Sequence, residues 1–516
     1  MLPGRSRTRG RHLGNTAATR WHARPGLTKL TKLIAGDGTV TSYSLDSFAT
    51  YGEIPDNWQA ASATLSGLTI GQGITSIGES AFDGSIYLVG SLVIPNSVTH
   101  IGNEAFYGTG FGGTLTLNEG LLSIGENTFE NGDFTGDLVI PDSVTFLGEE
   151  AFRDFGATGT LTIGSGIEEI EDKAFKCAAF TGALVIPAGV EFVKDEAFEE
   201  CFGFTSLELN EGLERIGDES FEDCNFTGTL TLPNSLTRID AEAFSGCDGF
   251  TGDLVIPNNV TEIEENAFQD CSGFNGHLTI GSGLTDPSKF EDYIFKECTG
   301  FTGVTILSGT TSIPEGTFFN CTSLTSATIP SSVTSIGESA FVFCGALTSV
   351  TIPDGVTSIS DWAFGSCYAM TSLTIGSGVT SIGEYTFSYC STLTSVTIPN
   401  SVTSIGAWAF YNDAALASLT IGSGVTSIGE YAFRKCYSLT SVTIPSSVTT
   451  MERYIFQTCT ALTHVTCNTT KAIFNATSNV LSGSAVTTIT APTGLDWTAG
   501  SGQTIGGQSG ITVTLV

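Results

Sequence analysis

The 516-residue sequence has few basic residues, few histidines and no long apolar run. It contains 20 Lys and Arg against 53 Asp and Glu, and its net charge of −33 opposes binding to nucleic acids and anionic membranes. No stretch approaches the roughly 18 consecutive apolar residues of a membrane span. The five histidines are scattered, no Cys-x-x-Cys motif occurs, and no nucleophile–base pair can be proposed. The sequence therefore predicts no enzyme, no cofactor and no dedicated metal site.

A phenylalanine instead recurs with a nearly fixed period, usually after a small residue. The steps are 23 residues, except for two of 24 and one of 27. A fixed period in this range is typical of a solenoid, in which each lap is one coil. The 17 recurring residues are Phe82, Phe106, Phe129, Phe152, Phe175, Phe198, Phe221, Phe244, Phe268, Phe295, Phe318, Phe341, Phe364, Phe387, Phe410, Phe433 and Phe456.

The pattern inside each unit predicts its local structure. Alternation as in Val350-Thr351-Ile352 places apolar side chains on one face of a half-buried strand. The motif "VTSI" predicts a second short strand, and "GEYAF" predicts one helical turn with its acid near the positive end. We therefore expect a β-rich solenoid of about 17 coils, with stacked parallel strands and short helical turns. The turn after the first strand alternates between "IP" and "IG" or "LN", so the units come in pairs.

These motifs resemble the BspA-like leucine-rich repeat family, whose units read roughly L-x-x-I-x-I-P-x-x-V-x-x-I-x-x-x-A-F-x-x-C. The resemblance covers about residues 65–467 and implies a right-handed solenoid. It also implies a surface or secreted protein that binds other proteins or host matrix, because relatives often do so. It implies no catalysis.

The ends and one coil depart from the pattern. Residues 1–36 carry eight basic and no acidic residues, which indicates a disordered leader or an organelle transit segment. Residues 37–64 form an expected N-terminal cap, in which "VTSYSLDSF" (40–48) aligns with "VTSIGEYAF" as a worn half-repeat. Residues 65–467 form the solenoid, with four extra residues that predict a bulge or kink at 284–295. Residues 468–516 are expected to be a C-terminal cap or an anchor that pairs with another chain.

The 13 cysteines follow the repeat. Buried cysteine behaves as a small apolar residue, so we expect a column of reduced thiols inside the coils. Cys177 comes one residue early, and Cys467 takes an inward strand position. The other eleven lie three residues after the repeat phenylalanine: Cys201, Cys224, Cys247, Cys271, Cys298, Cys321, Cys344, Cys367, Cys390, Cys436 and Cys459.

An acidic ladder lies three residues before the phenylalanine in 13 of the 17 units. One interpretation is stabilisation of the start of each helical turn on a solvated face. The other is that stacked carboxylates raise one another's pKa and bind calcium weakly. The second interpretation favours the stretch 168–224, with Asp172, Asp195 and Asp218 as weak cation candidates.

The residues between the inward Val and Ile of each first strand predict a binding surface of hydroxyl groups. A nearly uncharged surface of this kind favours hydrogen bonds to a protein or polysaccharide ligand, although threonine is also a common exposed strand residue. The sequence thus predicts a binding or adhesion scaffold; the alternative is a structural spacer or fibre component that assembles through its C-terminal tail. The residues are Ser349, Thr351, Ser372, Thr374, Ser395, Thr397, Ser418, Thr420, Ser441 and Thr443.

Overall fold

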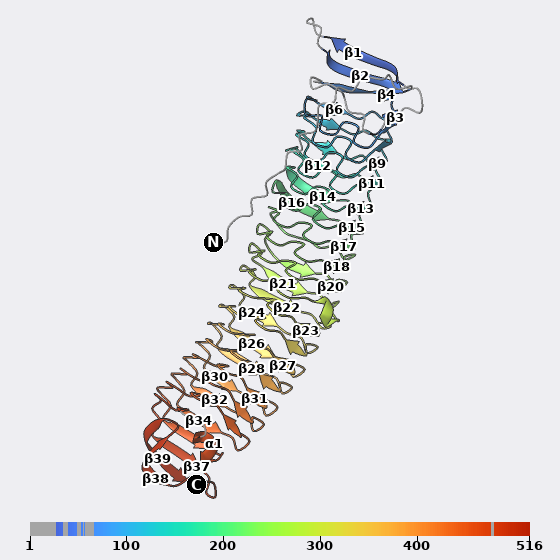
Figure 1. Ribbon diagram of the computed structural model, residues 1–516. Coiled ribbons are helices and arrows are strands. Elements are labelled where there is room, and N and C mark those ends of the chain that lie inside the picture. Colours follow the sequence, from blue (N-terminus) through green and yellow to red (C-terminus); the bar gives the residue numbers. More distant parts are fainter. Residues whose placement is uncertain (1–26, 35–39, 49–52, 55, 57–66, 476–478) are drawn as a thin grey trace.

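The computed structural model is an elongated, gently curved stack of coils (Figure 1). It describes all residues except 1–26, 35–39, 49–52, 55, 57–66 and 476–478. The predicted solenoid of parallel strands is confirmed, with about 20 turns in place of 17. The count differs because coils at the ends lack the marker phenylalanine. Phe456 N donates to Val480 O as Phe433 N donates to Ile455 O, so Leu481 takes the phenylalanine's place in a further coil.

The first strands form one side of the stack (Figure 1). They are β2 (Val40–Phe48), β4 (Leu68–Gly73), β6 (Leu92–Val93), β8 (Leu115–Thr116), β10 (Leu138–Val139), β12 (Leu161–Thr162), β14 (Gly182–Ile186), β16 (Phe204–Leu209), β19 (Leu254–Ile256), β21 (His277–Ile280), β22 (Gly303–Ile306), β24 (Ser326–Thr328), β26 (Ser349–Ile352), β28 (Ser372–Ile375), β30 (Ser395–Thr397), β32 (Ser418–Thr420), β34 (Ser441–Ile444), β36 (His464–Cys467), β37 (Thr488–Ala491) and β39 (Gln508–Leu515).

The second strands form the other side, and each has two residues. They are β3 (Glu53–Ile54), β5 (Ser76–Ile77), β7 (His100–Ile101), β9 (Ser123–Ile124), β11 (Phe146–Leu147), β13 (Glu169–Ile170), β15 (Phe192–Val193), β17 (Arg215–Ile216), β18 (Arg238–Ile239), β20 (Glu262–Ile263), β23 (Ser312–Ile313), β25 (Ser335–Ile336), β27 (Ser358–Ile359), β29 (Ser381–Ile382), β31 (Ser404–Ile405), β33 (Ser427–Ile428) and β35 (Thr450–Met451).

The register places equivalent residues of successive coils side by side. Ser349 lies opposite Ser372 and Thr351 opposite Thr374, and the second strands pair in the same way. The longest sheets join six first strands (β19 to β28) and seven second strands (β23 to β35). The repeat length therefore fixes which side chains form continuous rows along the stack.

The "GEYAF" segments are not helical turns, and this part of the prediction is wrong. The residues two before and two after the phenylalanine have positive φ, as at Tyr385 (53°) and Tyr389 (62°). Alternate amides then point along the stack: Tyr385 N, Phe387 N and Tyr389 N each donate to a carbonyl of the next coil. The coils are thus joined by backbone hydrogen bonds here as well as at the strands. Helices within the described residues are limited to a 3₁₀ turn, η1 (Pro287–Lys289), and α1 (Lys471–Asn475).

The alternation of "IP" and "IG" has a steric cause. A Cβ atom at Gly376 would lie 2.4 Å from Pro353 O, and one at Gly422 would lie 2.3 Å from Pro399 O. Both distances are shorter than real Cβ contacts, so these two positions require glycine. In the same pairs, Asp354 Oδ1 accepts from Ser377 N, and Asn400 Oδ1 accepts from Ser423 N. The turns of two neighbouring coils therefore fit each other as a unit.

The N-terminal half-repeat alignment is wrong. Strand β2 pairs in parallel with β4, with Tyr43 opposite Leu68 and Leu45 opposite Ile70. Residues 40–48 therefore occupy a first-strand place, because their alternating sequence continues as one extended strand. Strand β1 (Leu27–Ile34), within the segment predicted as a leader, pairs antiparallel with β2. The rest of the leader lies outside the described residues.

The 17 repeat phenylalanines form one continuous stack of rings in the core. Successive ring centroids lie 4.9 Å apart (Phe318 and Phe341) to 5.9 Å apart (Phe295 and Phe318), and the rings are nearly parallel. Offset-stacked pairs add about 0.5–1.5 kcal/mol each beyond the area that they bury. A coil therefore gains stability only from its neighbours, as the sequence predicted.

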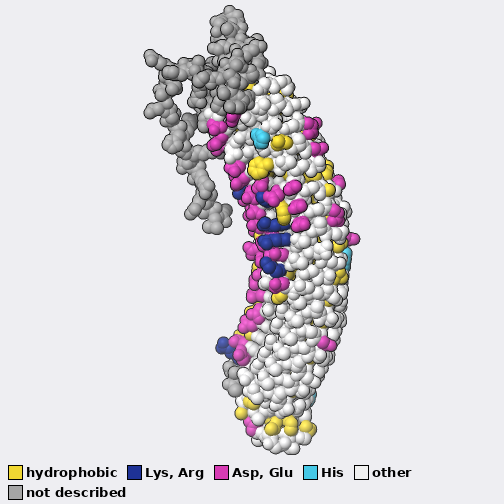
Figure 2. Space-filling model, turned by 90° about the vertical axis from the view of Figure 1, so that its right-hand side faces the viewer, with side chains coloured by type: hydrophobic (Ala, Val, Ile, Leu, Met, Phe, Trp, Pro, Cys, Tyr) yellow, Lys and Arg dark blue, Asp and Glu magenta, His cyan; other side chains and the backbone are white. Residues whose placement is uncertain are grey.

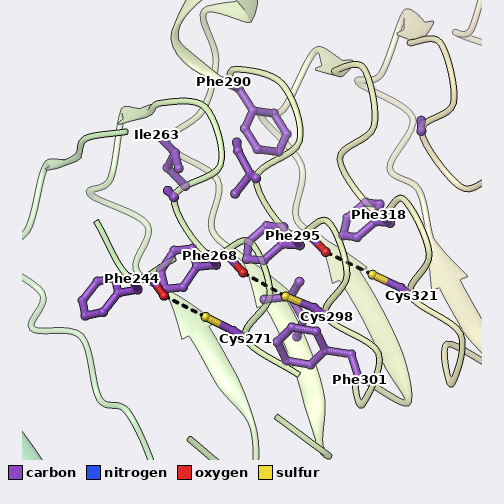
Figure 3. Close-up of a cluster of buried hydrophobic side chains, with 14 of the residues drawn as sticks. Phe244, Ile263, Phe268, Cys271, Phe290, Phe295, Cys298, Phe301, Phe318 and Cys321 are labelled. Carbon is purple, nitrogen blue, oxygen red and sulfur yellow. Dashed lines mark hydrogen bonds between the residues drawn. The ribbon is translucent and has the colours of Figure 1, made fainter. Parts of the chain in front are cut away.

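The thiol column runs beside this stack (Figure 3). All 13 cysteines are free, and every one except Cys177 is buried. Each thiol of the column from Cys201 to Cys459 donates to the carbonyl of the phenylalanine one coil earlier, as from Cys271 Sγ to Phe244 O at 3.0 Å. Burial raises the pKa of Cys224, Cys271 and Cys367 well above the ordinary value. The column holds protonated thiols, which agrees with the sequence interpretation.

One coil places a carboxyl group in the thiol column. Asp413 follows Phe410 by three residues, and its side chain is fully buried between the coils of Cys390 and Cys436. Its Oδ1 accepts from Cys390 N at 2.9 Å, whereas its Oδ2 has no hydrogen-bond partner in the described part of the chain. Burial therefore raises the pKa of Asp413 well above its ordinary value.

The C-terminal residues continue the first-strand sheet. Strands β36, β37 and β39 pair in parallel, and β38 (Gly500–Ile505) adds an antiparallel edge. Trp497 is buried, and its Nε1 donates to Thr469 O at 2.8 Å. This segment is thus packed on the last coil, and whether it acts as a cap or as an anchor stays a prediction.

Candidate functional site

The ten predicted hydroxyl residues form two rows on the outer side of the first strands β26 to β34. All ten side chains are exposed, while Val350, Val396 and Val442 between them are buried. Parallel pairing sets Ser395 opposite Ser418 and Thr397 opposite Thr420. We call these ten residues the hydroxyl face.

The hydroxyl face differs from the other threonine rows in its hydrogen bonding. Thr357 Oγ1 donates to Thr334 O at 3.2 Å, and Thr380 Oγ1 donates to Thr357 O at 3.0 Å, so that row stabilises the backbone. Among the described residues, none of the ten hydroxyls of the face has a side-chain hydrogen bond. Their donors and acceptors are therefore available to a ligand.

The N-terminal half presents a different surface at the equivalent strand position. Val93, Val139, Val185 and Val255 are exposed where the later coils have threonine. Coils that alternate with these carry threonine at the same position, as at Thr116 and Thr162. A continuous hydroxyl surface is therefore confined to the C-terminal half.

The acidic ladder holds backbone amides of the next coil. Asp172 Oδ1 accepts from Asp195 N at 3.2 Å, Asp195 Oδ1 from Asp218 N at 3.1 Å, and Asp218 Oδ1 from Ala241 N at 3.1 Å. No helix starts here, so the expected helix-start role is wrong. The carboxylates instead accept amides that join one coil to the next.

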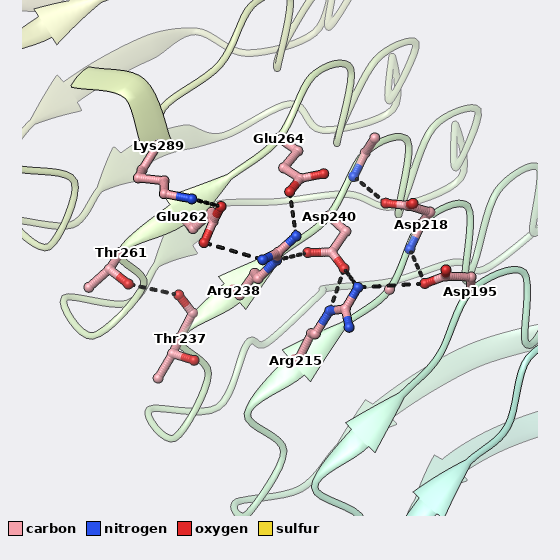
Figure 4. A network of polar contacts seen from close by, with 12 residues as sticks. Asp195, Arg215, Asp218, Thr237, Arg238, Asp240, Thr261, Glu262, Glu264 and Lys289 are labelled. Carbon is pink, nitrogen blue, oxygen red and sulfur yellow. Dashed lines mark hydrogen bonds and ion pairs between the residues drawn. The ribbon is translucent and has the colours of Figure 1, made fainter. Parts of the chain in front are cut away.

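Basic side chains lie among the acids of this stretch (Figures 2 and 4). Arg215 and Arg238 both pair with Asp240, whose side chain is fully buried, and Arg215 also lies 3.7 Å from Asp195. Asp195, Asp218 and Asp240 bring their oxygens within 4.8 Å of one another, whereas Asp172 belongs to no such group among the described residues. Burial, and then the charge of Asp195, raises the pKa of Asp218. Weak calcium binding at these acids stays a prediction.

A second acidic group has no basic partner. Glu219, Glu222 and Glu242 converge within 4.8 Å, and no ion pair to them occurs in the described part of the chain. Burial raises the pKa of Glu222 to about 7, with further contributions from Glu219 and Glu242. This carboxyl group therefore titrates near neutral pH.

The sequence reasoning missed a row of aromatic rings two residues before the phenylalanines. Trp362 and Tyr385 stack at 4.2 Å, and Arg434 lies over the ring of Tyr431 at 5.0 Å. The recurrence of Trp or Tyr at this place in five successive units could have revealed it. The row is Trp362, Tyr385, Trp408, Tyr431 and Tyr454.

Helices of sufficient length and hydrophobicity to span a bilayer are absent from the residues that the structure describes.

A family model described as "BspA type Leucine rich repeat region (6 copies)" matches residues 52–181, 169–286, 288–414 and 380–497. These matches cover most of the sequence. The chain belongs to the BspA-type leucine-rich repeat family. Repeat regions of this family are generally non-catalytic scaffolds. No curated protein matched the sequence significantly.

Solved structures with similarity to this BspA-type chain include three bacterial proteins. A leucine-rich repeat protein from Bacteroides ovatus is 19% identical, with 90% of this chain and 93% of that chain covered and a TM-score of 0.37. A leucine rich cell surface protein from Faecalibacterium prausnitzii is 21% identical, with coverages of 88% and 98% and a TM-score of 0.31. The leucine-rich repeat protein of T. pallidum is 28% identical over 34% of this chain and 85% of its own, with a TM-score of 0.32. The family assignment rests on the repeat model.

Proposed function

We propose that this chain is a non-catalytic binding or adhesion scaffold that recognises a protein or glycan through the hydroxyl face. The observation that carries the proposal is the set of ten exposed hydroxyls, in two rows along β26 to β34, that have no side-chain partner among the described residues. Extended sheet faces of solenoids are common binding surfaces. A cell-surface or secreted location is proposed from the family alone.

The surface favours hydrogen bonding over charge. Ser and Thr hydroxyls each offer one donor and two acceptor lone pairs, so both rows can bind alternating polar groups of a ligand. Because equivalent residues repeat from coil to coil, the surface suits a ligand that is itself repetitive, such as a polysaccharide.

The test is a triple variant, Thr374→Lys, Thr397→Lys and Thr420→Lys, compared on glycan and matrix-protein arrays with the unchanged chain. A matched control is Thr322→Lys, Ser446→Lys and Thr460→Lys, since these exposed hydroxyls lie outside the strands and make no side-chain hydrogen bond to any residue that the structure describes. We expect the first variant to lose binding while the control keeps it. A ligand that binds both variants like the unchanged chain would contradict the proposal.

The second candidate function is a structural spacer that assembles through its C-terminal tail. The edge strand β38 favours it, because Gly500, Ser501 and Gly502 are exposed and unpaired edges can join another chain. Sedimentation over a range of concentrations, with Ser501→Lys as the assembly-deficient variant, would test it. A monomer at all concentrations would rule it out.

A further inference from the structure

The four extra residues of the irregular coil lie beside a groove on the second-strand side of the stack. Turn η1 projects beside the second strands (Figure 1), and an isolated parallel bridge joins Ile263 of β20 to Phe290, the residue after η1. A groove of about 400 Å³ lies next to this projection. Its lining comes from five successive coils: Glu265, Pro287, Ser288, Phe290, Glu291, Asp292, Ser312, Ile313, Pro314, Ser335, Ile336, Gly337 and Ser360.

The carboxylates of this insertion groove are uncompensated. Glu265, Glu291 and Asp292 form no ion pair within the described residues. The nearby Lys289 is engaged elsewhere, since its Nζ lies 2.5 Å from Glu262 Oε1. The groove therefore presents negative charge to whatever enters it.

The same groove offers neutral hydrogen-bonding groups. Ser312, Ser335 and Ser360 come from three successive coils, and their hydroxyls have no side-chain hydrogen bond in the part of the chain that the structure describes. Ile313 and Ile336 are buried beneath them, which gives the floor a fixed backbone. Ser312 lies opposite Ser335, whereas Ser360 lies two residues beyond Ser358, the residue opposite Ser335. Hydroxyls at these positions can bond to the main chain of a peptide that crosses the coils.

We propose that the insertion groove binds an extended, lysine- or arginine-containing segment of a partner protein. The charge of the groove favours cationic side chains, and the serine hydroxyls suit the peptide backbone between them. The three carboxylates are absent from the groups of converging acidic ligands among the described residues, so a bound divalent ion fits less well. The groove lies on the second-strand side, and the proposal is independent of the hydroxyl face.

The insertion groove can also fix the position of a bound partner along the stack. Equivalent coils offer a ligand many nearly identical positions, whereas the insertion occurs at one coil step of 27 residues. Insertions in repeat proteins commonly map to a binding face. A partner that docks beside η1 is therefore held at one defined height along the stack.

The test uses a fluorescein-labelled hexalysine peptide and fluorescence anisotropy with the full chain. The groove variant is Glu265→Gln, Glu291→Gln and Asp292→Asn. In the unchanged chain Glu315 N donates to Asp292 Oδ1 at 3.0 Å, and asparagine keeps an oxygen that can accept this hydrogen bond. The matched control is Glu119→Gln, Asp133→Asn and Glu149→Gln, which changes the net charge equally at exposed carboxylates in distant coils.

We expect the groove variant to lose about tenfold in affinity, which is about 1.4 kcal/mol, since three partly exposed ion pairs with the peptide are removed and each is weak. The control should change affinity less than twofold. Equal losses in both variants would show non-specific attraction to an acidic protein and would overturn the proposal, as would an unchanged affinity of the groove variant. Should the triple variant melt early, Ser288→Lys on the exposed turn η1 must give the same loss for the proposal to stand.

Discussion

Replacing Asp413 by cysteine should stabilise the protein at neutral pH. The buried Asp413 Oδ2 has no hydrogen-bond partner among the residues that the structure describes, and an unsatisfied buried polar group costs about 1–3 kcal/mol. A thiol at this place would stand in line with Cys390 and Cys436, each of which donates to the phenylalanine carbonyl one coil earlier, at 3.5 and 3.4 Å. The substitution also removes the acceptor of Cys390 N, which offsets part of this gain. We therefore expect Asp413→Cys to raise the free energy of unfolding by about 1 kcal/mol at pH 7.

The gain should depend on pH in a defined direction. The folded pKa of Asp413 lies above the unfolded value of about 4, so the folded state holds the proton more tightly. The stability of the unchanged protein therefore falls as the pH rises from about 4 toward the folded pKa. The difference from Asp413→Cys should be smaller at pH 4 than at pH 7, and Asp413→Asn should show the same pH dependence as the cysteine variant.

The assay combines thermal melting with amide hydrogen exchange of the coils around residues 390–436, because long repeat arrays do not always unfold in one step. Asp354→Asn controls for the lost charge. Asp354 is exposed, and its Oδ1 accepts a hydrogen bond from Ser377 N. Asn400 accepts the equivalent hydrogen bond from Ser423 N, so asparagine can replace Asp354 without loss of this contact. Equal stability of Asp413→Cys and the unchanged protein at pH 7, or a difference that does not grow from pH 4, would refute the reasoning.

Three further predictions concern the thiols and the acids. The buried cysteines should react slowly with a colorimetric thiol reagent in the folded state, and all 13 should react after denaturation without reductant; finding most of them already paired would contradict the thiol column. Millimolar calcium should raise the melting temperature slightly through the acidic ladder, and Asp195→Asn with Asp218→Asn should remove the effect; no calcium effect on the unchanged chain would return these acids to a structural role. Because the pKa of Glu222 is raised to about 7, its ionisation should lower stability as the pH rises from about 4.5 through 7. Glu222→Gln should therefore raise the melting temperature at pH 8 and leave it nearly unchanged at pH 4, with Glu119→Gln as the control; a shift of equal size at both pH values would count against it.

The sequence predicted the regular parts of the fold because one signal, repeated at the coil length, specifies them. The buried phenylalanine, the cysteine three residues later and the alternating strand of Val350-Thr351-Ile352 each keep their place from coil to coil. The hydroxyl face followed from the same alternation. These predictions depend only on which face of a strand a residue occupies.

The predictions failed where backbone conformation, and not side-chain pattern, decides the outcome. "GEYAF" has helix-forming residues, yet Tyr385 and Tyr389 adopt positive φ so that amides can reach the next coil. The contacts between coils override the local helical preference. Residues 40–48 resemble the repeat in sequence, but they form one continuous strand that pairs with β4 on one side and with β1 on the other. The insertion groove and the row of aromatic rings likewise depend on how neighbouring coils stack.

Repetition separates the source of stability from the source of specificity in this protein. Regular coils stabilise one another through the phenylalanine stack, and identical coils serve this purpose as well as different ones do. A ligand bound to the regular hydroxyl face gains affinity from many equal contacts, but it can slide by one pair of coils at little cost. Fixed recognition requires a feature that occurs at one height along the stack. The insertion at 284–295, with η1 and its uncompensated carboxylates, supplies such a feature. If both proposals hold, variants of the hydroxyl face should alter affinity for a repetitive ligand, and variants of the groove should alter the position at which a basic partner binds.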